Sequence, residues 1–222
     1  MKKKMKTAKE AIENIKDGDT VMVGGFMSTG TPEILIDALV AKGVRDLTII
    51  CNDGGCPGRG VAKLIANRQV KRLIASHVGL NPEVGIQMDA GVMEVQLVPQ
   101  GTLAERIRSA GAGLGGFLTP TGVGTIVAEG KKQMKIEGVD YLLELPLKAD
   151  FALVRGSITD TFGNTIYNKA TRNFNPLIAT AAAEVIVAAE KIVEIGGIPP
   201  ESVVTSGIFV DYIVGGEKPW RI

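Results

Sequence analysis

The chain has 222 residues, 45% of them hydrophobic, which is enough for one substantial core or at most two small ones. Its 25 basic residues nearly balance 24 acidic residues, and this net charge of +1 argues against nucleic acid or a membrane surface as a partner. Two cysteines are too few for a disulfide framework, no run reaches the roughly 18–20 apolar residues of a membrane span, and no apolar segment follows the lysine-rich start, so a cytoplasmic location without a secretory signal is expected.

The first half of the chain predicts strands that alternate with helices. Thr7 and Glu10 form a T-x-x-E capping box for a first helix. A strand near 20–24 follows, and Pro32 opens a helix that ends at Gly43. The alternation continues with strands at 47–51, 71–76 and 93–98 and helices at 60–67, 82–89 and 102–110. This order predicts an α/β fold, a mostly parallel open sheet flanked by helices.

The second half of the chain departs from this rhythm. Residues 132–145 read as two short strands around Glu137-Gly138, which predicts a small hairpin insertion. We expect further strands near 150–154, 165–167 and 185–189, a turn at 162–164 and an alanine-rich helix opened by Pro176. No low-complexity linker and no internal repeat divides the chain, so residues 1–222 are expected to form a single domain.

Three polar loops follow predicted strands, at residues 24–30, 52–55 and 99–102. Ligands of open α/β sheets bind at the carboxyl ends of strands, where such loops meet. Glycines let a ligand approach bare backbone N–H groups, and the N-terminus of the following helix favours negative charge. The sequence therefore predicts a ligand site built from these three loops.

The first loop belongs to a longer pattern, DGDTVMVGGFMSTGTP at residues 17–32. A polar turn and apolar residues are followed by Gly-Gly-Phe, three residues, Gly, one residue and Pro. This pattern resembles the signature of the alpha (A) subunit of class I, 3-oxoacid type, coenzyme A transferases. Further segments resemble the family in the same order, namely CNDGG, SHVG, PQGTLAERIRSAGAG, FLTPTGVGT and NFNPL. The resemblance covers nearly the whole chain and implies the Rossmann-like layering of that subunit.

The resemblance implies transfer of CoA between a short-chain acyl-CoA and a free carboxylate such as acetate, butyrate or acetoacetate. In the family a glutamate attacks the thioester, giving a mixed anhydride and then a glutamyl-CoA thioester. That glutamate lies on the beta subunit, in a Ser-Glu-Asn-Gly context that residues 1–222 lack. A separate beta subunit is therefore the expected partner, in an α2β2 or larger hetero-oligomer, with CoA as a substrate and no tightly bound cofactor.

The same resemblance assigns site residues by position. Asn52 and Gln100 match the polar residues that support catalysis, because the oxyanion of a thioester reaction needs oriented donors. The proposed CoA-binding stretch matches Gly24, Gly25, Phe26, Met27, Ser28, Thr29 and Gly30. Fused relatives commonly carry two asparagines where this chain has Asn52-Asp53, which leaves the role of Asp53 open.

Several other residues are assigned structural roles. We expect none of Glu105, Glu129 and Glu144 to be the nucleophile, and Glu105 to pair with Arg106 or Arg108 on the wet side of its helix. His77 is the only histidine and has no nucleophile–acid pair around it, which excludes a triad.

Three further features are also interpreted as structural. Cys51 and Cys56 lack a second pair, so no metal site is expected, and Cys51 is expected to be buried. The G-x-G-x-x-G at 111–116 follows a helix instead of a strand, which is the wrong context for a dinucleotide. The lysines at 131, 132 and 135 read as a solvated face.

Three alternatives remain open from the sequence. A subunit of a 3-oxoadipate or succinyl-CoA:3-oxoacid CoA-transferase would share most of these motifs. A non-catalytic CoA-binding domain could keep the same fold. A nucleotide-dependent dehydrogenase or a sugar-phosphate isomerase has similar layering, but the misplaced glycine motif argues against it.

Overall fold

The computed structural model describes residues 4–219. The strands of its main sheet are β1 Thr20–Val23, β2 Leu47–Ile50, β3 Val70–Ala75, β4 Glu94–Leu97, β8 Ala149–Asp160, β9 Thr165–Ile166, β10 Ala182–Val193 and β11 Tyr212–Gly215. Their order is β11-β10-β8-β1-β2-β3-β4, with β9 paired to β8. All neighbours are parallel except β8 and β9. The prediction of a mostly parallel open sheet is confirmed.

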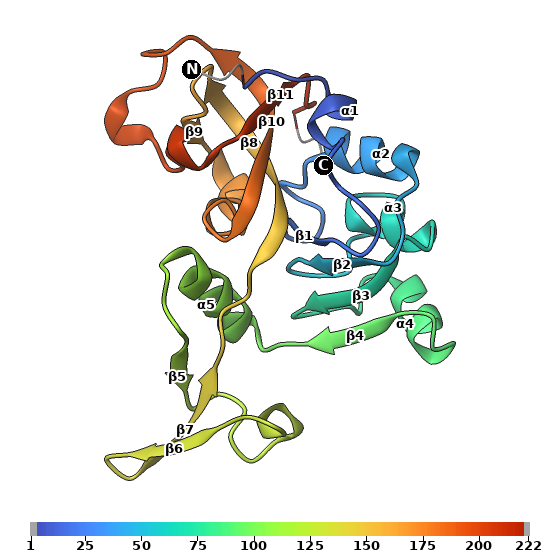
Figure 1. Cartoon of the computed structure of the whole chain (residues 1–222), viewed down its shortest axis with the longest axis vertical. Coiled ribbons are helices and arrows are strands. Elements are labelled where there is room, and N and C mark those ends of the chain that lie inside the picture. The colour runs from blue at the N-terminus through green and yellow to red at the C-terminus, as the bar shows by residue number, and fades with distance from the viewer. Residues whose placement is uncertain (1–3, 220–222) are drawn as a thin grey trace.

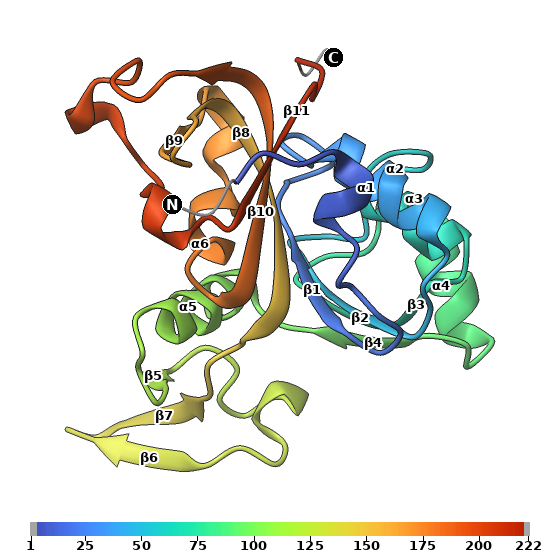
Figure 2. The same cartoon turned by 45° about the horizontal axis from the view of Figure 1, so that its top comes forward.

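Helices cover both faces of this sheet, as Figure 2 shows. One face carries α1 Ala8–Ala11, α2 Glu33–Lys42, α3 Val61–Ala66 and α4 Pro82–Asp89, and the other carries α5 Gln100–Gly111 and α6 Asn175–Ile178. Side chains of a strand alternate between the two cores: Val21 and Val23 lie in the first, and Met22 in the second. Short 3₁₀ helices cover Ile126–Ala128, Lys169–Arg172, Pro200–Ser202 and Gly207–Phe209.

The ends of the first helices follow their sequence signals. Thr7 Oγ1 accepts a hydrogen bond from Glu10 N, and the Glu10 carboxylate accepts one from Thr7 N at 2.9 Å, so the capping box is present. Gly43 ends α2 with φ +75°, a left-handed conformation that glycine adopts without a Cβ penalty. Within the described part of the chain, no helix is both long enough and apolar enough to cross a membrane.

A small antiparallel sheet projects from the body at the bottom of Figure 1. It consists of β5 Phe117–Thr119, β6 Gln133–Ile136 and β7 Val139–Glu144, in the order β5-β7-β6. The predicted hairpin is confirmed as β6 and β7, which pair from Ile136 with Val139 to Gln133 with Leu142. The third strand, β5, was not predicted, because three residues are too short to show a period.

Two predicted boundaries are wrong. The helix expected at 102–110 begins at Gln100, so Gln100 lies in its first turn and the preceding loop is shorter than expected. The alanine-rich segment after Pro176 is not a helix: α6 ends at Ile178, and β10 begins at Ala182. Pairing along the full length of β8, from Ala149 to Asp160, overrides the helix propensity of alanine.

Candidate functional site

The site lies at the carboxyl edge of the main sheet. From β1 the chain moves outward through β2, β3 and β4, and it later returns to place β8 on the other side of β1. The strand order therefore reverses between β1 and β8, and the glycine-rich loop at 24–30 leaves β1 at this switch point. In open α/β sheets this is the usual position of a ligand.

A chain of side-chain hydrogen bonds joins the loops that follow β1, β2, β3 and β4. Asp53 Oδ2 accepts from Met27 N and from Asn52 Nδ2, both at 2.7 Å. Gln100 Nε2 donates to Asn52 Oδ1 at 2.6 Å, and Ser76 Oγ donates to Gln100 Oε1. The predicted residues Asn52 and Gln100 thus lie in contact, and Ser76 joins them although only its SHVG segment, and not the residue, was singled out.

Burial separates the roles of these residues. The exposed fractions are 3% for Asn52 and 4% for Asp53, whereas Gln100 is exposed. An amide nitrogen carries two hydrogens, and Asn52 accepts only one of those on Gln100 Nε2. Gln100 therefore has a second N–H for an oxygen atom of a ligand, while Asn52 lies beneath it and holds it in place.

The loop at 24–30 contains a tight turn. Phe26 and Thr29 exchange two backbone hydrogen bonds of 2.9 Å, and the residues between them, Met27 and Ser28, have φ of +49° and +62°. Residues other than glycine adopt this region at a cost. The turn persists because Asp53 accepts from Met27 N and because Ser28 Oγ accepts from Cys56 N at 3.0 Å.

Two asparagines of the NFNPL segment hold the same loop from the other side. Asn173 Oδ1 accepts from Gly25 N at 3.1 Å, and its Nδ2 donates to Thr29 O at 3.0 Å. Asn175 Nδ2 donates to Gly30 O at 2.9 Å. The NFNPL segment was part of the family resemblance, but neither asparagine was assigned a role from the sequence. Two amide side chains two residues apart were the signal that could have indicated one.

Asn175 also explains the first glycine of the loop. A Cβ atom on Gly24 would lie 1.9 Å from Asn175 Oδ1, a distance that no side chain can occupy. Only glycine allows the asparagine to pack this closely against the end of β1.

The expectation of bare N–H groups fails for five amides of this loop. The amides of Gly24, Gly25, Phe26, Met27 and Thr29 all donate to protein acceptors. The N-terminus of α2 is also occupied, because Ile34 N donates to the Glu217 carboxylate at 3.1 Å. This strained turn needs internal acceptors to persist, so these donors are not available to a ligand.

The loop instead presents side chains to a cavity. Phe26 and Met27 are 45% and 47% exposed. With Thr29, Ala170 and Asn173 they line a cavity of about 350 Å³. A neighbouring cavity of about 480 Å³ also contains Thr29, together with Asn168 and Lys169. The predicted stretch therefore borders open space, and an apolar, flexible ligand chain fits its two exposed side chains better than a phosphate does.

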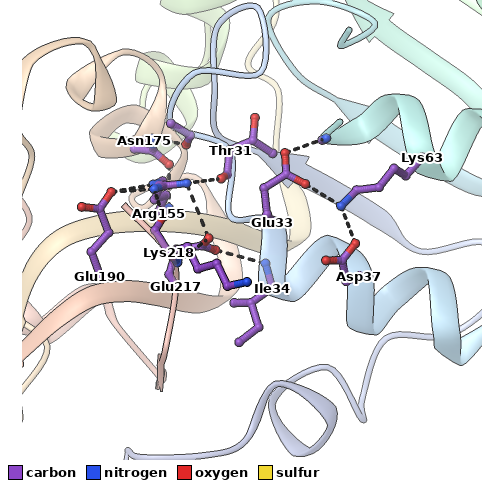
Figure 3. A network of polar contacts seen from close by, with 12 residues as sticks. Thr31, Glu33, Ile34, Asp37, Lys63, Arg155, Asn175, Glu190, Glu217 and Lys218 are labelled. Atoms are coloured by element: carbon purple, nitrogen blue, oxygen red, sulfur yellow. Dashed lines mark hydrogen bonds and ion pairs between the residues drawn. The ribbon is translucent and has the colours of Figure 1, made fainter. Parts of the chain in front are cut away.

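A buried arginine holds the far end of the loop (Figure 3). The Arg155 side chain is 1% exposed and donates to Thr31 O at 3.1 Å and to the Glu190 carboxylate at 2.6 and 2.9 Å. It also donates to Lys218 O and lies 3.5 Å from the Glu217 carboxylate, whose pKa burial raises above its ordinary value. Arg155 thereby ties β8 to the loop, to β10 and to the segment after β11.

Two of the three glutamates excluded from catalysis are paired with basic side chains. Glu105 pairs with Arg108 at 2.9 Å on the surface of α5. Glu144 is buried in β7 and binds Lys131 at 2.5 Å, with Arg106 at 3.8 Å. Arg106 is thus half-buried, contrary to the expectation that it lies in solvent. The G-x-G-x-x-G begins where α5 ends, at Gly111, as expected.

The two cysteines of the site are expected to differ in reactivity. Cys51 is buried, its Sγ donates to Asp53 O at 3.0 Å, and burial raises the pKa of its thiol. Because the thiolate is the reactive form, iodoacetamide at pH 8 should label Cys56 in the folded protein at least about tenfold faster than Cys51. Mass spectrometry of the labelled peptide measures both, and labelling in urea is the control. Equal rates in the folded protein would contradict this burial.

Comparisons with known proteins identify one family. The family model described as coenzyme A transferase matches residues 5–216. The chain is 52% identical to the acetate CoA-transferase subunit alpha of Escherichia coli K12, over 98% of this chain and 99% of that protein. It is 53% identical to the acetoacetyl-CoA:acetate/butyrate CoA transferase alpha subunit of Clostridium acetobutylicum, over 90% and 91%.

A solved structure extends the comparison to the fold. An acyl-CoA transferase of E. coli O157:H7, in a thioester complex with CoA, superposes with a TM-score of 0.83 at 25% identity. The match covers 96% of this chain and 47% of that one, so this chain spans about half of the larger enzyme. The family match over nearly all of the chain and the two relatives above 50% identity agree, and the chain therefore belongs to the coenzyme A transferase family.

Proposed function

We propose that this chain is the alpha subunit of a CoA-transferase that moves CoA between a short-chain acyl-CoA and a free carboxylate such as acetate, butyrate or acetoacetate. The observation that supports this most directly is the exposed Gln100 amide, held by the buried Asn52 at the carboxyl edge of the sheet. The names of its relatives support an alpha-type subunit that acts with a beta subunit.

The proposed reaction begins when a glutamate of the beta subunit attacks the thioester carbonyl. The tetrahedral oxyanion collapses with loss of the CoA thiolate, which leaves an acyl-glutamyl anhydride. The thiolate then attacks the glutamyl carbonyl, releases the carboxylate and forms the glutamyl-CoA thioester; the acceptor acid reverses these steps. The second N–H of Gln100 would donate to the developing oxyanion, where a fixed donor has its largest effect.

The division of labour follows from this chain's own carboxylates. Glu105 and Glu144 are paired with basic side chains, and Glu144 is buried, so neither is free to attack a thioester. The exposed Phe26 and Met27 line a cavity that suits the flexible pantetheine arm of CoA. We propose that residues 24–30 contact this arm, that CoA is a substrate and not a bound cofactor, and that the whole chain is one domain.

The substrate preference follows the order of similarity. Identity is 52% and 53% to the two relatives named for acetate or acetate/butyrate, 46% to a relative named for 3-oxoadipate, and 43–47% to relatives named for succinyl-CoA:3-ketoacid. We therefore propose acetate, butyrate and acetoacetate as the acids. Two unpaired cysteines fit a cytoplasmic enzyme.

The test is reconstitution. The purified chain alone should transfer no CoA from acetoacetyl-CoA to acetate, and a mixture with its beta subunit should do so. Loss of the acetoacetyl-CoA absorbance reports the rate, and thermal shift with CoA reports binding. Transfer by the single chain would refute a nucleophile on the partner. Binding of CoA by an inactive mixture would favour a non-catalytic CoA-binding domain.

A further inference from the structure

We propose that Asp53 is the positioning residue of this site: it orients the amides of Asn52 and Gln100 and holds the turn at 26–29. This inference rests on the proposed function, in which Gln100 faces the reacting carbonyl. The residue occupies the position where fused relatives commonly carry a second asparagine, and its contacts in this chain give it a distinct role.

The Asp53 carboxylate accepts every hydrogen bond that it makes with its neighbours in the site. Three N–H groups face the two Asp53 oxygens: Gly55 N donates to Oδ1 at 2.8 Å, and Met27 N and Asn52 Nδ2 donate to Oδ2. Asp53 therefore acts only as an acceptor, and Asn52 must turn its nitrogen toward it.

The orientation of Asn52 in turn fixes the orientation of the exposed Gln100 side chain. With its nitrogen on Asp53, Asn52 presents Oδ1 to Gln100 and can accept only from the Gln100 nitrogen. Gln100 Oε1 consequently faces the Ser76 hydroxyl, whose oxygen also lies 2.8 Å from Asn52 O. The second N–H of Gln100 remains for a ligand. Reversal of Asn52 would reverse Gln100 and place an oxygen where the oxyanion needs a donor.

Asp53 also supports the strained turn at residues 26–29. Met27 has φ +49°, and among residues 4–219 its amide has no acceptor other than Asp53. The same carboxylate oxygen thus joins Met27, on the proposed CoA-contacting stretch, to Asn52, beneath the proposed oxyanion donor. One buried group, 4% exposed, sets both halves of the site.

Asp53→Ala provides the sharpest substitution. It removes both acceptor oxygens, so Gly55 N, Met27 N and Asn52 Nδ2 all lose their acceptor and Asn52 is free to reverse. In the complex with the beta subunit we expect kcat to fall about tenfold while KM for acetoacetyl-CoA changes less than about threefold. In a Gln100→Ala background the same substitution should change kcat less than about twofold, because the residue through which it acts is gone.

Asp160→Ala is the matched control. Asp160 is also buried at the end of a strand, and accepts from the amides of Phe162, Gly163 and Asn164 and from Asn164 Nδ2, but it contacts none of the three loops. We expect both substitutions to lower the unfolding midpoint, and only Asp53→Ala to lower kcat. A kcat loss of equal size in both variants, or an equal Asp53→Ala loss with and without Gln100, would overturn the proposal.

A spectroscopic readout is independent of turnover. In TROSY spectra of the ¹⁵N-labelled chain within the complex, the side-chain amide of Gln100 is assigned by its absence in Gln100→Ala. Asp53→Ala should shift this resonance and Asp160→Ala should leave it unmoved, whatever reaction the complex performs. An unmoved resonance in Asp53→Ala would refute the orienting role. A wild-type complex without transferase activity would instead refute the proposed function, and the spectra would still decide the role of Asp53.

Discussion

Replacement of Arg155 with methionine is expected to destabilise the folded chain by about 3–5 kcal/mol, the usual cost of removing one partner from a buried ionic network. Methionine would fill much of the volume, but it would leave the Glu190 and Glu217 carboxylates without their cation. The carbonyls of Thr31 and Lys218 would also lose a donor, as Figure 3 makes clear. Urea unfolding followed by circular dichroism measures the change.

The pH dependence of this variant provides a second check. Burial already raises the Glu217 pKa above its unfolded value, so the folded state holds this proton more tightly than the unfolded state does. The contribution of Glu217 to the free energy of unfolding is therefore complete below its unfolded pKa. It is lost as the pH rises through its raised, folded pKa. Without Arg155 the Glu217 pKa should rise further. The loss of unfolding free energy in Arg155→Met should therefore be smaller at acidic pH than at pH 7. Addition of Glu217→Gln should recover part of the deficit at pH 7.

An exposed ion pair supplies the control. Arg108 binds Glu105 at 2.9 Å on the surface of α5, where both side chains remain about half exposed. Arg108→Met should change the free energy of unfolding by less than about 1 kcal/mol, because such pairs are screened by solvent. A similarly small change in Arg155→Met would show that the buried network contributes little to the fold.

Arg155→Met should also bind CoA less tightly, because Arg155 holds Thr31, which directly follows the loop at 24–30.

The first half of the fold could be predicted because its signals are local. Capping at Thr7, a prolyl start at Pro32 and a glycine stop at Gly43 each act within one turn of helix. Strands β1 to β4 lie next to one another in chain order, so a pattern of alternating elements also gave their arrangement. Only residues 185–189 of the long β10 were predicted as a strand, because its partner β8 lies elsewhere in the chain and pairing with it overrides the preference of the preceding alanines for helix.

The residues of the candidate site also differ in whether a local sequence pattern indicates them. Asn52 and Gln100 could be identified because each lies in a recognisable segment at the end of a strand. The residues that orient the site could not, since their contacts join distant positions. Asp53 reaches Met27 over 26 residues, Arg155 reaches Thr31 over 124, and Asn173 reaches Gly25 over 148. No local pattern indicates which buried carboxylate or amide will meet a strained turn formed so far away.

Gln100→Ala is expected to lower kcat of the reconstituted enzyme by about 100-fold, the effect of removing one oxyanion donor in comparable sites. KM for the acyl-CoA should change less than about threefold, because the donor interacts more strongly with the oxyanion than with the ground-state carbonyl. Steady-state kinetics with acetoacetyl-CoA and acetate measures both constants. A rise in KM with kcat unchanged would mean that Gln100 contributes binding to substrate and transition state alike.

Gln100→Glu separates the donor from the shape of the side chain. Glutamate has nearly the same size, but both its oxygens are acceptors and neither can donate to Asn52 Oδ1. It would also place a negative charge beside the developing oxyanion. Its kcat should therefore be as low as that of the alanine variant or lower, although it fills the same space beside Ser76 and Asn52. A glutamate variant that kept most of its activity would show that position 100 acts by packing, and the oxyanion donor would then have to come from elsewhere in the complex.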